Sequence, residues 1–151
     1  LGEANGSFRL RADVTDDRHS QPFDGFNVWK GDNIQFAFQL PGQTGHWEIG
    51  LSRLDSGKSE VIVFQTPTGF DPAAVAKACR LVTTREGNVT GYDFTLPGNA
   101  AGMTPEMFRN GFRFNLLVND NDGAGRDGWI HIAPGIGDSK NPDKFPFVVF
   151  E

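Results

Sequence analysis

The chain has 151 residues, 38% of them hydrophobic and 22% charged, a balance that fits one soluble globular domain and argues against disorder. Its formal net charge is −5 and it has no stripe of Lys and Arg, so we expect no nucleic-acid partner. No apolar run approaches the roughly 20 residues that span a bilayer, so we expect no membrane span. The first residues show neither the basic segment nor the apolar segment of a signal peptide, so we expect any signal peptide to be already absent.

The dominant pattern along the chain is an alternation of apolar and polar residues, which is typical of half-buried strands. Ser7–Val14 carries apolar side chains at its even positions and charged ones at 9, 11 and 13. Asn33–Leu40 repeats the pattern with Ile, Phe, Phe and Leu at its even positions. Gln35 and Gln39 then face the other side of the sheet, where we expect Gln35 to be free for contacts.

Further short segments with strand character follow: His46–Leu54, Glu60–Gln65, Arg80–Thr84, Val89–Leu96, Phe112–Val118, Trp129–Ile132 and Phe147–Phe150. Turn signals with Gly or Pro separate several of them, at 41–42, 55–57, 86–88 and 97–99. Many short strands with such turns predict an all-β fold, an antiparallel, jelly-roll-like β-sandwich that forms a single domain over residues 1–151.

Helix is predicted at only two places, Asp71–Lys77 and Thr104–Phe108. Each begins with a residue that caps helix N-termini and continues with proline at the first helical position. We therefore expect one or two short helices, which cover an edge or an end of the sandwich.

The end of the first strand carries two adjacent carboxylates, Asp16 and Asp17, followed by His19. Carboxylate oxygens suit Ca²⁺, but they also cap tight turns, and both readings stay open. His19 is a weaker candidate for contact with a ligand or a metal.

The next turn brings Trp29 close to Asp32. An indole face suits the C–H face of a pyranose, while a nearby carboxylate accepts a hydrogen bond from a sugar hydroxyl. The alternative is that Trp29 closes the core at the sheet edge and Asp32 caps the turn.

The segment Asn119–Gly128 holds five Asn or Asp residues and three glycines in ten positions. Asp120 and Asp122 resemble the start of a calcium loop, but the terminal Glu of the EF-hand spacing is missing. Arg126 and Trp129 offer a guanidinium for hydroxyl oxygens and a ring for a C–H face. The alternative is that Arg126 forms ion pairs within the acidic loop. His131 shares the face of Trp129 if the strand is regular.

The candidates thus form two groups. Those for ligand contact are Trp29, Asp32, Gln35, Asn119, Arg126, Trp129 and His131. Those for metal are Asp16, Asp17, Asp120 and Asp122. No catalytic residue is assigned, because no motif of a nucleophile or a zinc site is present and a glycosidase's carboxylate spacing is not readable from sequence.

Five segments in this order resemble the family 9 carbohydrate-binding module and its DOMON-like relatives. They are Val14–His19, Trp29–Gln35, Gly91–Pro97, Asn115–Trp129 and Pro134–Pro142, and the resemblance runs from about residue 8 to the end. It implies a β-sandwich that binds sugars, holds a terminal sugar between two tryptophans and carries structural calcium. Trp29 and Trp129 are the candidates for that pair, with Trp47 third. Some DOMON relatives bind haem through Met and His, but Met103 and Met107 are expected in the core.

The resulting expectation is a non-catalytic carbohydrate-binding module of a secreted protein, extracellular or periplasmic, with calcium as its cofactor. Its partners would be an oligo- or polysaccharide and a parent catalytic domain in a larger chain. Two alternatives are kept: a structural, calcium-stabilised accessory domain without sugar binding, and a carbohydrate-active enzyme.

Overall fold

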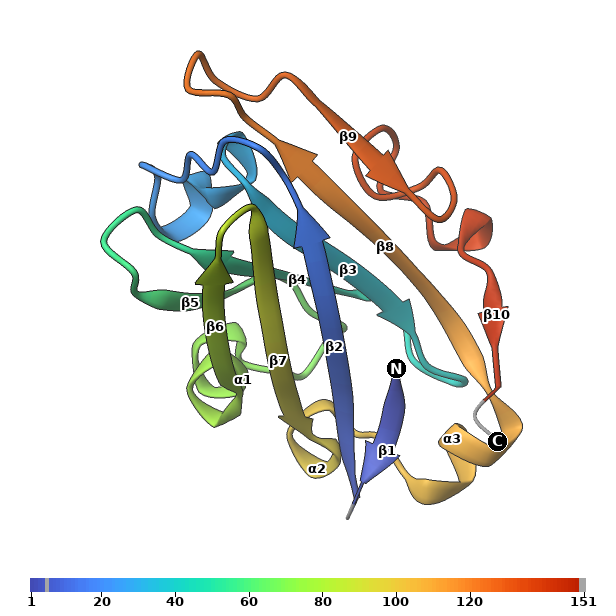
Figure 1. The fold of residues 1–151 in the computed structure, drawn as a ribbon. Coiled ribbons are helices and arrows are strands. Elements are labelled where there is room, and N and C mark those ends of the chain that lie inside the picture. Colours follow the sequence, from blue (N-terminus) through green and yellow to red (C-terminus); the bar gives the residue numbers. More distant parts are fainter. Residues whose placement is uncertain (5, 150–151) are drawn as a thin grey trace.

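A computed structural model describes residues 1–4 and 6–149 and shows two antiparallel sheets packed face to face (Figure 1). The smaller sheet has the strand order β1–β2–β7–β6, with bounds Gly2–Ala4, Ser7–Thr15, Val89–Pro97 and Arg80–Glu86. The larger sheet runs β10–β8–β3–β4–β5, with bounds Phe147–Val148, Phe112–Asp120, Asn33–Gln39, Trp47–Arg53 and Ser59–Gln65. The short strand β9, Gly128–His131, also pairs with β8. The predicted antiparallel β-sandwich is confirmed.

The core between the sheets is built from phenylalanine rings at the positions that the alternation predicts. Phe8 on β2 and Phe36 on β3 are both 0% exposed, and their ring centroids lie 5.8 Å apart. Phe36 also meets Phe94 of the opposite sheet edge to face, at 5.3 Å. Burial of apolar surface on this scale is the main stabilising contribution in a sandwich, because each ring removes a large area from water.

Each strand predicted from the sequence is present, with ends that differ by a few residues. The short edge strand β1 was not predicted, because three residues show no usable alternation. The last predicted strand is reduced to Phe147–Val148, and Phe150 lies outside the described residues.

Both predicted helices form where their caps indicate. α1 (Pro72–Ala78) begins after Asp71, whose carboxylate accepts a hydrogen bond from the backbone N–H of Ala73, and α3 (Pro105–Asn110) begins after Thr104. A third helix, α2 (Gly98–Ala101), forms where only a turn was predicted. The described chain therefore has one α-helix more than the two that were expected. α2 is a single turn that ends at Gly102, whose φ of 70° favours glycine. Within residues 1–4 and 6–149, no helix is long and apolar enough to cross a membrane.

The two methionines lie in the core, as expected. Met103 is 6% exposed just before α3, and Met107 packs against the same cluster. α1, α2 and α3 gather at one end of the sandwich, whereas the loops that carry most of the candidate residues gather at the other, here named the loop end (Figure 1).

The outer face of the larger sheet is covered more fully than the sequence suggested. Gln35 lies on that face, opposite Phe36, but it is only 4% exposed. The segment after β9, with the 3₁₀ helix η2 (Pro142–Lys144), folds back and forms a second small apolar cluster there: Ala37, Leu117, Ile136 and Phe145. Gln35 is therefore more covered than the alternation suggests, because β3 is a central strand with packing on both faces, although Gln35 still lines a hollow on that face.

Candidate functional site

Most of the candidate residues for ligand contact lie at or beside two separate hollows. The first, the inter-sheet cavity, has a volume of about 220 Å³ and lies between the two sheets at the loop end. The second, the aromatic cleft, has a volume of about 370 Å³ and lies over the outer face of the larger sheet. Small-molecule sites commonly occupy hollows of about 300–1,000 Å³, so the aromatic cleft is the more suitable for a sugar.

The aromatic cleft is lined by side chains from both predicted and unpredicted positions: Phe26, Trp29, Gln35, Glu48, Phe64, Gln65, Arg126, Gly137 and Lys140. Its rings lie on one wall, where Phe26 is 68% exposed and Trp29 is 39% exposed. The 3₁₀ helix η1 (Gly25–Lys30) presents both of them. Exposed rings beside polar side chains are the composition that a saccharide requires.

η1 is held in place from inside the fold by Gln21. The Gln21 side chain is 1% exposed and donates hydrogen bonds to the backbone carbonyls of Val28, at 2.8 Å, and Asp32, at 2.9 Å. Its carbonyl accepts from the N–H of Phe23 at 3.3 Å. This network fixes the entry to and the exit from η1, and with them the position of Trp29.

We expect Gln21→Ala to lower the free energy of unfolding by about 1–3 kcal/mol, because buried carbonyls lose their donors. Saccharide affinity is expected to fall as well, since η1 is released. Urea denaturation together with a titration measures both. Asn110→Ala, which changes an exposed amide at the opposite end of the sandwich, is the control. A Gln21→Ala protein with unchanged stability would show that the network does not hold η1.

The Arg126 guanidinium lies over two tryptophan rings. Its central carbon is 4.1 Å from the ring centroid of Trp129 and 5.8 Å from that of Trp29. The two predicted tryptophans therefore do come together, but Arg126 lies over both rings. Trp29 lines the aromatic cleft, and the Trp129 ring lies beside that cleft, next to Arg126 and Gly137 on the outer face of the larger sheet.

Arg126 finds no acceptor in the part of the chain that the structure describes. Its Nε and Nη2 are buried without a hydrogen-bond partner, and desolvation by burial lowers the pKa of Arg126 below its ordinary value. No carboxylate within residues 1–4 and 6–149 forms an ion pair with it. The alternative that Arg126 is neutralised within the acidic loop is therefore wrong.

Glu48 and Lys140 are cleft residues that the sequence reasoning missed. Glu48 is 2% exposed on β4, and Lys140 reaches it from the segment after β9 to donate a hydrogen bond. Lys140 is also the non-glycine residue with positive φ, 47°, in the described chain. Such a backbone conformation is uncommon for lysine and is the structural signal that marks the position.

Two other predicted contacts lie elsewhere. Trp47 is 0% exposed and stacks on Phe38 at 5.8 Å, so the core occupies it. His131 is exposed on β9, opposite Leu117, and lines neither the inter-sheet cavity nor the aromatic cleft.

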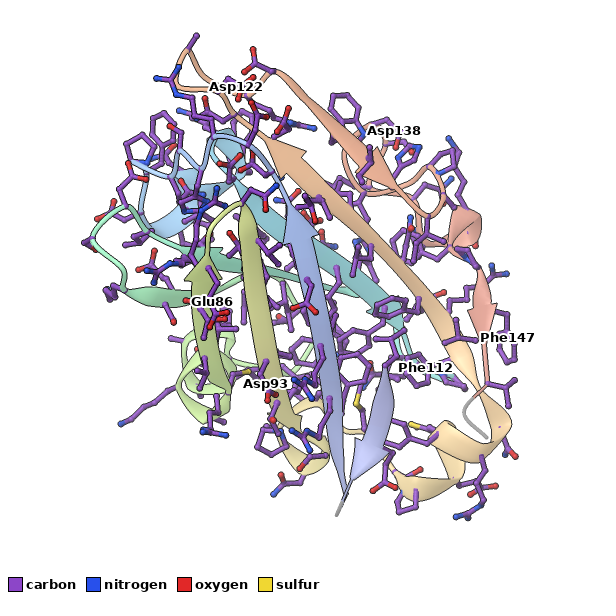
Figure 2. The ribbon with its side chains drawn as sticks, viewed as in Figure 1. Glu86, Asp93, Phe112, Asp122, Asp138 and Phe147 are labelled. Atoms are coloured by element: carbon purple, nitrogen blue, oxygen red, sulfur yellow. The ribbon has the colours of Figure 1, made fainter. Side chains whose placement is uncertain are left out.

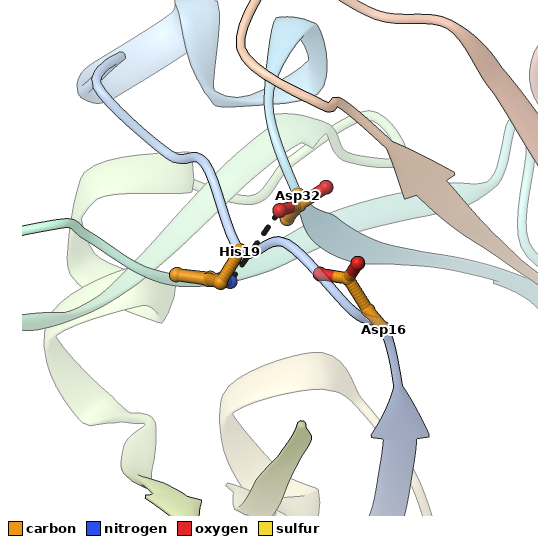
Figure 3. Close-up of side chains that lie close together, drawn as sticks. All are labelled: Asp16, His19 and Asp32. Carbon is orange, nitrogen blue, oxygen red and sulfur yellow. Dashed lines mark ion pairs between the residues drawn. The ribbon is translucent and has the colours of Figure 1, made fainter. Parts of the chain in front are cut away.

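Asp32 lines the inter-sheet cavity and not the aromatic cleft beside Trp29. Its carboxylate accepts backbone hydrogen bonds from Ser20, at 2.5 Å, and Asn121, at 2.7 Å. His19 Nδ1 lies 3.5 Å from Asp32 Oδ2 (Figure 3). Desolvation by burial is the largest influence and raises the pKa of Asp32 to about 7. The two backbone hydrogen bonds act in the opposite direction, whereas the negative charges of Asp16 and Asp120 add to the increase. This is the capping role that the sequence left open, since Asp32 ties the β2–β3 connection to the loop after β8.

Two buried amides with unsatisfied polar atoms lie on the outer face of the larger sheet, where β3 pairs with β8. Asn119 donates from Nδ2 to Asn33 Oδ1 at 2.6 Å across the β3–β8 pair. The other ends of these amides, Asn33 Nδ2 and Asn119 Oδ1, are buried with no partner among the described residues. The Asn119 side chain, predicted as a ligand contact, therefore lies on the same face as Leu117 and is held there by Asn33.

The four predicted metal ligands lie in the strand ends and loops of the loop end, where Figure 2 labels Asp122. Side-chain oxygens of Asp16, Asp17 and Asp122 lie within 4.8 Å of one another. Asp120 lines the cavity close by, where desolvation raises its pKa and the charges of Asp122 and Asp16 raise it further. Asp16 Oδ2 is buried without a hydrogen bond, with Arg85 Nη1 at 3.8 Å as its ion-pair partner. An oxygen-rich, mutually repelling set of this kind fits a hard divalent cation such as Ca²⁺.

Neither a protein-family model nor a curated protein matches the sequence. Solved structures do match. One is a carbohydrate-binding module family 9 from Caldicellulosiruptor kristjanssonii in complex with glucose, with a TM-score of 0.69 and 13% identity, which covers 96% of this chain and 71% of that one. Another, from the same organism and in complex with cellotriose, has a TM-score of 0.68 and 14% identity over 96% of this chain and 69% of that one. The chain therefore has the fold of a family 9 carbohydrate-binding module.

Proposed function

We propose that this chain is a non-catalytic carbohydrate-binding module that takes up an oligo- or polysaccharide in the aromatic cleft. The observation that carries the proposal is the cleft itself, where Trp29 and Phe26 stand exposed beside an unpaired guanidinium. The fold supports it, since the similar solved modules are described in complex with glucose and with cellotriose. On this proposal the module belongs to a secreted, extracellular or periplasmic protein and serves a parent catalytic domain in a larger chain.

The cleft offers the two kinds of contact that a sugar ring needs. The C–H face of a pyranose packs on Trp29, while the amides of Gln35 and Gln65 and the ammonium of Lys140 are placed for its hydroxyls. Hydrolysis would require two carboxylates about 5–10 Å apart. Among the described residues that line the cleft, Glu48 is the one carboxylate, and it is paired with Lys140. The arrangement supports binding without catalysis.

Calorimetric titration against a panel of neutral and acidic oligosaccharides tests the proposal. We expect saturable binding with a modest dissociation constant, because a few contacts offset the cost of immobilising the ligand. Tryptophan fluorescence provides a second readout, since Trp29 lies at the cleft. The absence of both heat and fluorescence change with every sugar would exclude the proposed function.

The carboxylates at the loop end favour a second role, the binding of structural calcium. We place the ion at Asp16, Asp17 and Asp122, because that set offers oxygens only. The other cluster, Asp16 with His19 and Asp32, contains an imidazole that already pairs with Asp32. Bound calcium would neutralise the repulsion among these carboxylates and stabilise the loop after β8.

Calcium in tenfold excess over its dissociation constant is expected to stabilise the fold by about 1.4 kcal/mol and to raise Tm by about 3–6 °C relative to chelator. Scanning calorimetry measures the shift. Asp122→Asn should remove the response, whereas Asp93→Asn, which alters a carboxylate on the smaller sheet paired with Arg9, should retain it. Equal responses in the two variants would place the ion elsewhere. A calcium response in a protein that binds no sugar would favour a purely structural accessory domain.

A further inference from the structure

The charge of the aromatic cleft differs in sign from that of the whole protein. The chain carries a formal charge of −5. The charged side chains that line the cleft are Arg126, Lys140 and Glu48, two positive and one negative, which leaves the cleft at +1. Lys30 adds a further cation beside the cleft, with its Nζ 5.6 Å from the Trp29 ring centroid. A positive hollow on an acidic protein attracts anions and disfavours cations.

The Lys140 and Glu48 charges neutralise each other, so the excess positive charge belongs to Arg126. No hydrogen bond or ion pair satisfies its guanidinium in the described chain, and burial is the cause of its lowered pKa. Keeping an ionised group partly out of water without an acceptor costs free energy, and buried charges are normally paired. The expected partner is therefore an anion that comes with the ligand.

The guanidinium is held in a fixed orientation. Trp129 stacks on it at 4.1 Å, and a side chain at Gly137 would come within 3.4 Å of its Nη2. Nε and Nη2 are the buried nitrogens, which leaves Nη1 as the nitrogen that a ligand reaches directly. A carboxylate that contacts Nη1 forms the charge-assisted hydrogen bond that the buried nitrogens of the same guanidinium lack.

The rings next to Arg126 add a requirement for a sugar. Trp29 and Phe26 form an apolar wall on the same cleft, and a bare inorganic anion would leave this wall unused. A pyranose that carries a carboxylate uses both features, with its C–H face on Trp29 and its carboxylate on Arg126.

We propose that the aromatic cleft selects acidic saccharides, in which a uronic acid presents its carboxylate to Arg126. This selectivity rests on the proposed function, because it names the class of sugar that the same cleft takes. Charge-assisted hydrogen bonds are about twice as strong as neutral ones, so the carboxylate dominates the choice between otherwise similar sugars.

Paired titrations test the selectivity. Glucuronate is compared with glucose, and a galacturonate trisaccharide with cellotriose, at low and at high ionic strength. We expect the acidic member of at least one pair to bind about tenfold tighter or more at low salt, and the advantage to shrink at high salt. Sulfate alone, which lacks a ring, is expected to compete weakly.

The variant Arg126→Gln tests whether the guanidinium causes the preference for acidic over neutral sugars. It should bring the ratio of acidic-sugar affinity to neutral-sugar affinity close to one, whatever its effect on the neutral sugar alone. Arg9→Gln removes the same charge from the outer face of the smaller sheet, where Arg9 pairs with Asp93, and should keep the preference. Retention of the preference in Arg126→Gln would overturn the assignment.

The outcomes separate this inference from the proposed function. Equal affinity for acidic and neutral sugars overturns the selectivity and leaves carbohydrate binding intact. Sulfate that binds as tightly as the uronate overturns the requirement for a sugar ring. No binding of any saccharide overturns both proposals.

Discussion

Replacing Trp29 by alanine is expected to weaken saccharide binding about 30-fold or more, which corresponds to about 2 kcal/mol. The indole is the largest ring on the wall of the aromatic cleft, and its partial exposure of 39% leaves a face for the ligand. Because the ring is outside the core, the variant should fold. Titration of wild type and variant with the same sugar measures the loss, and a melting curve confirms the fold.

Trp129→Ala is the matched comparison, since Trp129 has a similar exposure of 44% and lies beside the aromatic cleft without being one of its lining residues. Its effect on a neutral sugar should be smaller than that of Trp29→Ala, because Trp129 bears on the cleft through Arg126 and Gly137 and does not line it. Trp29→Phe should keep part of the affinity by keeping a ring. A larger loss in Trp129→Ala would place the sugar between the two tryptophans and not on the wall formed by Trp29 and Phe26.

The stability of the protein in chelator is expected to fall as the pH rises from about 4 to about 7, by on the order of 4 kcal/mol. Burial raises the pKa of Asp32 from an ordinary value of 3.8 to about 7, so the folded state holds a proton that the unfolded state has released. The stabilising contribution of the protonated group is complete below the unfolded pKa and is lost as the pH passes through the folded pKa. One pKa unit corresponds to about 1.4 kcal/mol. Urea denaturation across this range measures the change.

Asp32→Asn separates this effect from other titrations. An amide accepts only one of the two backbone hydrogen bonds from Ser20 and Asn121, so the variant should be less stable at low pH. The diagnostic quantity is the slope of stability against pH, which should become nearly flat. The carboxyl ¹³C shift of Asp32 gives an independent reading of its pKa. An unchanged slope in the variant, or titration of Asp32 near pH 4, would contradict the prediction.

Local sequence determined most of the fold. The alternation in residues 7–14 and 33–40 placed Phe8 and Phe36 in the core, because a strand turns successive side chains to opposite faces. The capping residues Asp71 and Thr104 located two short helices through bonds within a few residues. α2 was missed because a single helical turn and a β-turn share the same Gly- and Pro-containing signals.

The candidate site was predicted only in part. Residue type alone identified Trp29, Arg126 and the carboxylates at the loop end as candidates, because an indole face suits a sugar ring and carboxylate oxygens suit calcium. It did not show that Asp32 belongs to a different hollow from Trp29, nor that Gln35 is covered.

The tertiary structure decided which of these residues meet. Glu48 and Lys140 are far apart in the chain, yet they face each other at the cleft because the segment after β9 folds over the outer face of the larger sheet. Arg126 reaches Trp29 because the pairing of β3 with β8 brings their two loops together. Periodicity specifies the face of a strand on which a side chain lies, but the neighbours of that strand are set by long-range pairing and packing. The sequence by itself therefore determined the strands, the core and the types of residue available for binding, and the packing of distant segments determined the cleft.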